Sequence, residues 1–193
     1  REAETAGRLQ HQNIVTIFDA GEEHDLAYIA MEFLKGSDLM VYCRAGQLLP
    51  VPLVVSIVAR VARALAYAHV QNVVHRDIKP ANIMYEPTTD TVKVTDFGIA
   101  RAVEDGAQQL TQTGMALGTP TYMAPEQGMG EKVGVTADIY SLGCMLFEML
   151  AGEPPFSGKN ASAILAKHVM EQVPSLRIIR QSVPEEVEYA IFC

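Results

Sequence analysis

One segment that is apolar on almost every side, residues 138–151, restricts the possible folds of this chain most strongly. A surface helix keeps a polar face, so a helix of this composition must be covered all round by other parts of the chain. Residues 53–70 predict a second helix, because their apolar positions recur at steps of three and four and so share one face. The sequence therefore predicts two packed core helices.

Short strand-like segments precede and follow the predicted helix at 53–70. The predicted strands span 13–23, 26–33, 73–75, 82–85 and 91–97. Further helical patterns occur near 161–171 and from 185 onward. Residues 100–135 show little periodicity, and a loop of that length in a compact chain tends to be functional. Because strands come first and helices later, the sequence predicts an α+β fold with its chemistry at the junction.

The charge balance excludes one class of function. The 193 residues carry 15 basic and 23 acidic side chains, a net charge of −8. A protein that binds a phosphate backbone needs a basic face. We therefore expect no nucleic-acid partner.

The cysteines and the apolar stretches bear on the compartment. Cys43, Cys144 and Cys193 form no CxxC pair, which indicates reduced, buried thiols and a cytoplasmic location. The longest apolar stretch is interrupted by charged and polar side chains, including Arg60 and Arg63, so we expect no membrane span in this chain.

Both ends of the sequence lie inside helical patterns. The chain starts without Met, and EEVEYAIFC at the other end has no capping residue. We expect a fragment cut at both ends. Such a fragment would leave one face of the first two strands partly uncovered.

Four short motifs occur in a fixed order. They are HRDIKPAN at 75–82, DFG at 96–98, GTPTYMAPE at 118–126 and DIYSLG at 138–143. Together they resemble the C-terminal lobe of a protein kinase, and most closely that of the bacterial, eukaryotic-like Ser/Thr kinases. The resemblance covers essentially the whole chain.

This resemblance implies a two-lobe kinase fold over 1–193. Residues 1–33 would be the remnant of the small lobe, with the end of one helix and two or three strands. Residues 34–193 would be the hinge and a truncated, mainly helical large lobe. The phosphate-covering glycine loop and its lysine strand would lie before Arg1, so we expect the fragment alone to be inactive.

The chemistry of phosphoryl transfer suits the residues in these motifs. Asp77 would accept the substrate proton, and Lys79 would place an ammonium beside the transferring phosphoryl group. Asn82 and Asp96 supply the hard oxygen donors that Mg²⁺ prefers, with Mn²⁺ as a substitute. Lys79 and Thr119 favour Ser or Thr over Tyr as the acceptor.

The resemblance also implies an ATP site. Met31 would be the gatekeeper, and the backbone of Glu32 and Leu34 would face the adenine edge. Met84 would form the apolar floor under the ring. Glu2 would be the helix glutamate that pairs with an upstream lysine, with Glu4 as the competing choice.

Other residues in the motifs have regulatory or structural roles in this interpretation. Thr111 and Thr113 would be autophosphorylation sites, modified within paired copies of the chain, and Arg76 would bind their phosphates. The alternative is a merely mobile polar loop.

Three further predictions concern buried or partly buried groups. Asp138 would accept hydrogen bonds from the backbone of residues 75–76, with a plain N-cap as the alternative. Glu126 would be a largely buried carboxylate. His75 could be a general base, but the resemblance makes it a packing residue.

The sequence therefore predicts an ATP-dependent protein Ser/Thr kinase that acts on protein substrates. A pseudokinase that serves as a binding module is one alternative, and the intact Asp77, Asn82 and Asp96 argue against it. A small-molecule phosphotransferase is another, and the peptide-binding segment 118–126 argues against that one. In many proteins of this kind the full-length chain is anchored in a membrane.

Overall fold

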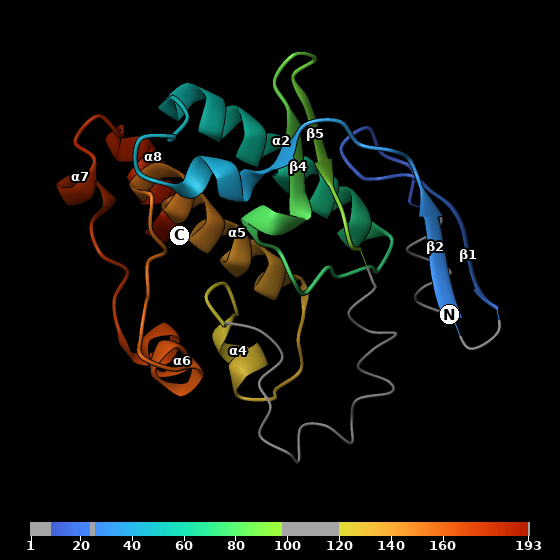
Figure 1. Cartoon of the computed structure of the whole chain (residues 1–193). Coiled ribbons are helices and arrows are strands. Elements are labelled where there is room, and N and C mark those ends of the chain that lie inside the picture. The colour runs from blue at the N-terminus through green and yellow to red at the C-terminus, as the bar shows by residue number, and fades with distance from the viewer. Residues whose placement is uncertain (1–8, 24–25, 98–119, 193) are drawn as a thin grey trace.

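The computed structural model describes residues 9–23, 26–97 and 120–192. Two helices form its centre, α2 (Val51–Val70) and α5 (Val135–Ala151), and they pack against one another. Figure 1 shows α7 (Leu176–Ile179) and α8 (Glu185–Phe192) at one end of α5, and α4 (Pro125–Gly128) and α6 (Ala161–Met170) below it. The two predicted core helices are thus confirmed.

Helix α5 is buried on nearly every side, as its composition predicts. It begins three residues before the predicted start, at Val135. It ends at Gly152, whose φ of +87° lies in the left-handed region that glycine adopts without steric cost.

Helix α2 begins directly after Pro50, and Pro52 occupies its first turn, where the missing N–H costs nothing. Within the described residues it is the one helix long and apolar enough to cross a membrane by length and composition. The buried core helix of a globular domain meets the same criteria. Val54, Ile57 and Val61 on its inner face are fully buried in the core, so we assign α2 to the core.

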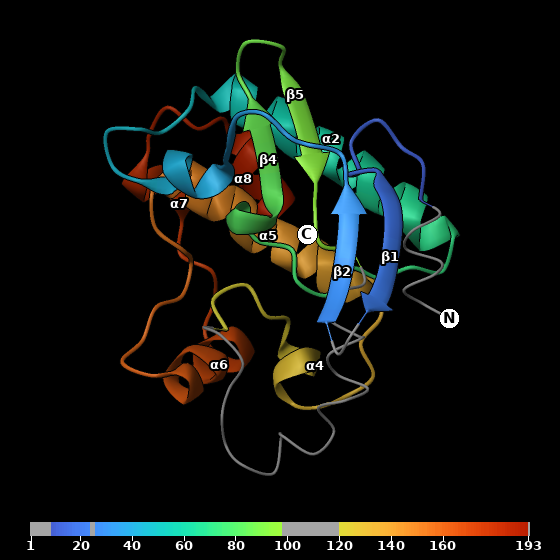
Figure 2. The same cartoon turned by 45° about the vertical axis from the view of Figure 1, so that its right-hand side comes forward.

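The structure contains two small antiparallel sheets. Strands β1 (Ile17–Glu23) and β2 (Leu26–Met31) form a hairpin, which Figure 2 shows from the front. Strands β3 (Ser37–Asp38), β4 (Ile83–Glu86) and β5 (Thr91–Val94) form the other sheet, in that order. In this second sheet Met84 is directly opposite Lys93.

Two predicted strands differ from the observed ones. Residues 13–15 do not extend β1 but run beside β5, with the N–H of Val15 donating to the carbonyl of Val94 over 2.9 Å. Residues 73–75 form no strand, because the backbone N–H of His75 donates instead to the carboxylate of Asp138. In both cases a tertiary contact takes the hydrogen bond that the pattern assigns to a sheet.

Short helices connect and follow these elements. They are η1 (Leu39–Cys43), η2 (Pro80–Asn82), α4 (Pro125–Gly128), α6 (Ala161–Met170), α7 (Leu176–Ile179) and α8 (Glu185–Phe192). The side chain of Asp38 caps η1 and that of Asn160 caps α6. Helices α6 and α8 agree with the predicted patterns within one or two residues. Helix α4 lies inside the segment predicted as a loop.

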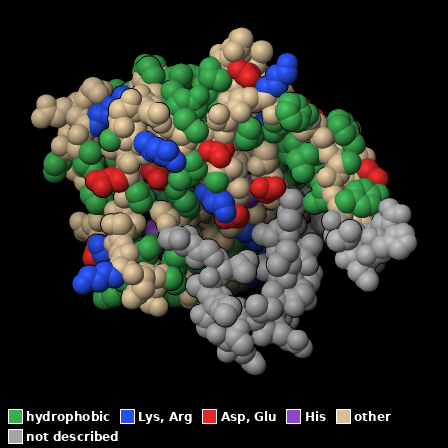
Figure 3. Space-filling view, in the orientation of Figure 1, with side chains coloured by type: hydrophobic (Ala, Val, Ile, Leu, Met, Phe, Trp, Pro, Cys, Tyr) green, Lys and Arg blue, Asp and Glu red, His purple; other side chains and the backbone are tan. Residues whose placement is uncertain are grey.

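The surface agrees with one further expectation. Figure 3 shows hydrophobic side chains over the β1–β2 hairpin, where Phe18 is 69% exposed, and Phe33, just after β2, is 89% exposed. On the same face, acidic and basic side chains are interspersed. The apolar exposure expected for the first two strands is therefore present.

Candidate active site

The loop from His75 to Asn82 connects the end of α2 to β4, and it contains a strained backbone position. Arg76 has a φ of +70°, and Asp96, after β5, has a φ of +62°. Non-glycine residues in this region cost of order 1–3 kcal/mol each and persist only where the surroundings fix them. The structure thus holds the residues at both predicted catalytic motifs in unusual conformations.

Asp77 is the centre of a small polar cluster. The Nζ atom of Lys79 donates to its Oδ2 atom over 2.7 Å. The amide nitrogen of Asn82 donates to the backbone carbonyl of Asp77 over 2.7 Å and to Oδ2 over 3.0 Å. Asn82 is buried, whereas the carboxylate of Asp77 is about half exposed. Lys79 and Asn82 therefore orient the carboxylate, and its exposed half stays open to a substrate.

Asn82 also fixes the position of Asp96. The backbone carbonyl of Asn82 accepts from the N–H of Thr95 over 2.9 Å and from its hydroxyl over 3.1 Å. This places Asp96, the next residue, beside the Asp77 cluster, with its side chain exposed. The structure therefore brings Asp77, Lys79, Asn82 and Asp96 to one place.

These residues fit a metal ion that is shared with a substrate. Within the described residues, the two side-chain hydrogen bonds of Asn82 both use its amide nitrogen, so Oδ1 could serve as an oxygen ligand, with the exposed Asp96 as a second one. No group of three or more His, Cys, Asp or Glu side chains that could hold a metal by itself occurs among the described residues. Mg²⁺ suits such a sparse set, since it keeps several waters and takes the remaining oxygens from substrate phosphates.

His75 lies beneath this cluster and is buried. Its Nε2 atom lies 2.8 Å from the carbonyl of Thr95, and its ring meets that of Phe97 edge to face at 4.6 Å. Burial lowers the pKa of His75 below its usual 6.5, although Asp138, Asp77 and Asp96 act in the opposite direction. This environment is that of a packing residue and not of a general base.

Asp138 supports the same loop from α5. Its carboxylate is completely buried and accepts from the backbone N–H of His75 over 2.9 Å and of Arg76 over 2.7 Å. It is also 2.7 Å from Nε2 of His69 on α2. The predicted hydrogen bonds to residues 75–76 are present. The N-cap alternative is wrong, because Gly134 occupies that position.

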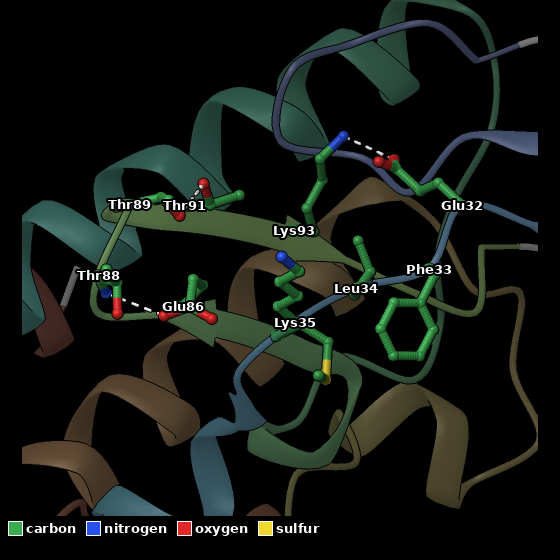
Figure 4. A pocket seen from close by; sticks show the side chains of 10 residues that line it. Glu32, Phe33, Leu34, Lys35, Glu86, Thr88, Thr89, Thr91 and Lys93 are labelled. Atoms are coloured by element: carbon green, nitrogen blue, oxygen red, sulfur yellow. Dashed lines mark hydrogen bonds and ion pairs between the residues drawn. The ribbon is translucent and has the colours of Figure 1, made fainter.

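A hollow of about 380 Å³ lies between the segment after β2 and the β4–β5 hairpin (Figure 4). Its lining includes residues 32–35, Met84, Glu86 and Lys93, together with Thr88, Thr89 and Thr91. Three of the residues predicted to contact a nucleotide, Glu32, Leu34 and Met84, thus lie together. Met31, at the end of β2, is not part of this lining.

Sequence reasoning missed Lys93, which lies opposite Met84 and forms an ion pair with Glu32 at 2.6 Å. It also missed His69. Lys93 alternates with the buried Val92 and Val94, which predicts an outward side chain but gives no partner. No sequence signal distinguishes either residue from an ordinary polar position, because each partner is more than 60 residues away.

The segment from Pro120 to Gln127 docks onto α5 and onto the loop of Asp77. The hydroxyl of Tyr122 donates to the carboxylate of Glu148, and the hydroxyl of Ser141 donates to the carbonyl of Tyr122 over 2.7 Å. Gln127 donates from its amide nitrogen to the carbonyl of Arg76 over 2.9 Å. Glu126 is of intermediate burial, and its carboxylate accepts from the hydroxyl of Thr136 over 3.3 Å.

Several predicted site residues lie outside the described part of the chain. They are Glu2, with its competitor Glu4, and Thr111, Thr113 and Thr119. Their roles stay predictions.

Comparison with known proteins agrees with this geometry. The family described as "Protein kinase domain" matches residues 1–190. The serine/threonine-protein kinase PrkC of Bacillus subtilis is 42% identical over 191 residues, which cover 99% of this chain and 29% of that protein. This chain therefore spans less than a third of that relative's length.

Two solved structures resemble the fold. The PknI kinase domain of Mycobacterium tuberculosis has a TM-score of 0.74 at 30% identity and covers 97% of this chain, which in turn covers 67% of that chain. Rad53 in complex with AMP-PNP has a TM-score of 0.80 at 27% identity, covering 100% of this chain and 48% of that chain.

The fold is that of a protein kinase with part of the small lobe and most of the mainly helical large lobe. The chain belongs to the protein kinase domain family, and its sequence is similar to bacterial Ser/Thr kinases. Use of ATP with a divalent metal ion, and action on protein substrates, are general in this family.

Proposed function

We propose that the protein carrying this chain is an ATP-dependent protein serine/threonine kinase. The observation that carries the proposal is the Asp77 carboxylate, held by Lys79 and Asn82 beside Asp96 and half open to solvent. The name of the PrkC relative supports the Ser/Thr assignment.

Each residue of the cluster has a distinct part in the transfer. Asp77 orients the acceptor hydroxyl and takes its proton, while the hydroxyl oxygen bonds to the γ-phosphorus and the bond to the β-phosphate oxygen breaks, which releases ADP. The Lys79 ammonium stabilises charge on the transferring group. Asn82 and Asp96 would hold Mg²⁺, or Mn²⁺ in its place. When bound, this metal ion neutralises the charge of the triphosphate.

The hinge, residues 32–34, would bind the adenine. Among the described residues, no backbone partner pairs with the carbonyl of Glu32 or the N–H of Leu34. Unpaired backbone groups beside a hollow favour a ligand with a matching polar edge. Met84 lines the hollow and would offer an apolar floor. Met31, the last residue of β2, does not line the hollow and stays a proposal as the gatekeeper. The AMP-PNP bound to Rad53 supports a nucleotide ligand.

The acceptor is proposed to be a protein. The segment from Pro120 to Gln127 is anchored by Tyr122 and Gln127 next to the Asp77 loop, which suits an extended peptide better than a small free alcohol. Thr119 would contribute to Ser/Thr selection with Lys79. A pseudokinase is disfavoured, since Asp77, Asn82 and Asp96 are all in place.

We also propose that the chain phosphorylates paired copies of itself at Thr111 and Thr113, with Arg76 as a partner for the phosphate. A cytoplasmic position would supply ATP and keep the buried thiols of Cys43 and Cys144 reduced.

Paired substitutions in the full-length protein that contains this chain test the proposal. Asp77→Asn should abolish most phosphate transfer to a generic protein substrate while ATP still binds. Asp96→Asn should weaken the binding of ATP with Mg²⁺, measured by calorimetry. Asp19→Asn, on the exposed hairpin, is the matched control and should change neither. Transfer by Asp77→Asn at the unsubstituted rate would contradict the assignment.

A further inference from the structure

The corner where β2 leads into the hinge is held by one carboxylate. The Oε1 atom of Glu32 accepts from the backbone N–H of Thr16 over 2.7 Å and from Nζ of Lys93 over 2.6 Å. The N–H of Glu32 donates in return to the carbonyl of Thr16 over 2.9 Å. Glu32, at the start of the hinge, is therefore bonded both to Thr16, which directly precedes β1, and to Lys93 of β5.

Lys93 contributes more than one contact at this corner. Its Nζ atom also donates to the carbonyl of Ile14 over 3.2 Å. The segment around Ile14 is itself paired with β5, through the bond from the Val94 N–H to the Asn13 carbonyl at 2.8 Å. One ammonium thus joins β5, the strand entry and the hinge.

The same lysine lies beside the floor of the hollow. Lys93 and Met84 are cross-strand partners, and both line the hollow. Figure 4 shows the side chain of Lys93 extending from β5 toward Glu32. Lys93 is the cross-strand partner of the residue proposed to underlie the adenine, and its ammonium bonds to the side chain of Glu32, the residue that would present the hinge carbonyl. Hinge and floor are therefore set relative to one another through a single side chain.

The ion pair is sheltered enough to matter. The side chains of Lys93 and Glu32 are 15% and 26% exposed. Burial alone would raise the pKa of Glu32, but the hydrogen bonds from Lys93 and Thr16 outweigh it and lower that pKa below its usual value. A partly buried, charge-assisted hydrogen bond is stronger and less screened than an exposed pair.

We propose that Lys93 is a positioning residue for the nucleotide. Lys93 holds the Glu32 carboxylate against residues 14–16. It thereby fixes the position of the hinge backbone relative to Met84, and the base must fit into the space between them. Lys93 acts through Glu32 and does not itself contact the reacting atoms. This inference rests on the proposed function, because it assumes that the hollow beside the hinge receives a nucleotide.

Substitutions at the pair separate positioning from mere structural support. Lys93→Met keeps the stem beside Met84 but removes the ammonium, and Glu32→Gln keeps the acceptor but removes the charge. In the full chain, Lys93→Met should raise the dissociation constant for ATP with Mg²⁺ about tenfold, or about 1.4 kcal/mol. The KM for ATP should rise in parallel, while kcat and the KM for the protein substrate stay within about twofold.

The pair should also show coupling. Because both variants break one interaction, Lys93→Met with Glu32→Gln should be no worse than Lys93→Met alone. Lys93→Arg, which keeps a donor, should bind nearly as well as the unsubstituted chain. Lys167→Met, which breaks the exposed pair with Glu171 on α6, is the matched control and should leave nucleotide affinity unchanged.

Two results would overturn this inference and leave the proposed function intact. One is a Lys93→Met chain with a lower melting temperature but unchanged affinity for ATP, which makes the lysine merely structural. The other is an equal rise in KM for ATP and for the protein substrate. If the unsubstituted full-length protein that contains this chain binds no ATP in calorimetry, the proposed function fails, and this inference fails with it.

Discussion

Asp138 accepts a hydrogen bond from the backbone N–H of Arg76 over 2.7 Å, although 62 residues separate the two in the chain. The carboxylate is completely buried and meets a second backbone donor at His75 and a ring nitrogen at His69. Three converging donors stabilise a negative charge without solvent. They also explain how Arg76 keeps a φ of +70° directly before Asp77.

We expect Asp138→Asn to destabilise the fold by about 3–5 kcal/mol, because the Asn side chain keeps one acceptor oxygen only and its NH2 group would face a buried donor that it cannot pair with. Unfolding in urea measures this loss, and phosphate transfer should fall with it, since the Asp77 loop loses its anchor. His69→Gln keeps a donor for Asp138 and should cost clearly less. An Asp138→Asn chain as stable as the original would show that these hydrogen bonds contribute little.

Glu148 gives a prediction about pH. Burial raises the pKa of this carboxyl above its usual 4.5, and the hydrogen bond from the Tyr122 hydroxyl opposes the rise. Tyr122→Phe removes that donor, so the folded-state pKa should rise further. A carboxyl whose pKa is higher in the folded than in the unfolded chain stabilises the fold at low pH. This contribution is lost as the pH rises from 4.5 through the folded-state pKa.

The stability lost in Tyr122→Phe should therefore be small near pH 4 and reach about 1–3 kcal/mol at pH 7. Thermal unfolding across this range measures it. In the double variant with Glu148→Gln no carboxyl remains to titrate, and the extra pH dependence should disappear. A loss that is equal at pH 4 and pH 7 would exclude Glu148 as the cause.

The two described thiols should be inert in the folded protein. Burial raises the pKa of both Cys43 and Cys144 to about 12, and both are free and buried. Because the thiolate is the reactive form, iodoacetamide at pH 8 should modify neither until the chain is unfolded. Peptide mass spectrometry after timed labelling measures this. Labelling of Cys43 at the rate of a small thiol would contradict its burial.

Autophosphorylation is predicted at Thr111 and Thr113. Each phosphate adds roughly two negative charges at neutral pH, which Arg76 can bind. Mass spectrometry of the active protein should find phosphate on one or both threonines, and Thr111→Ala with Thr113→Ala should lower activity. Full activity with both threonines unmodified would favour the alternative of a plain polar loop.

Some of the fold could be predicted from local sequence alone. The burial of α5 follows from its composition, and the single apolar face of α2 follows from its period. The grouping of Asp77, Lys79 and Asn82 is favoured by their closeness in the chain, since all three lie in one short loop. These features depend on short-range geometry, which sequence spacing determines directly.

The remaining features depend on contacts between distant segments. Residues 13–15 alternate like part of one strand, yet they pair with Val94 of β5 through two backbone hydrogen bonds that the local pattern does not predict. The partial exposure of Glu126, and the pairing of Lys93 with Glu32 across 61 residues, likewise have no local signal. The sequence by itself determined which helices are buried, and it predicts which side chains carry the chemistry. Only the tertiary structure decided which charges and backbone groups meet, because hydrogen bonds between distant segments depend on how the whole chain packs.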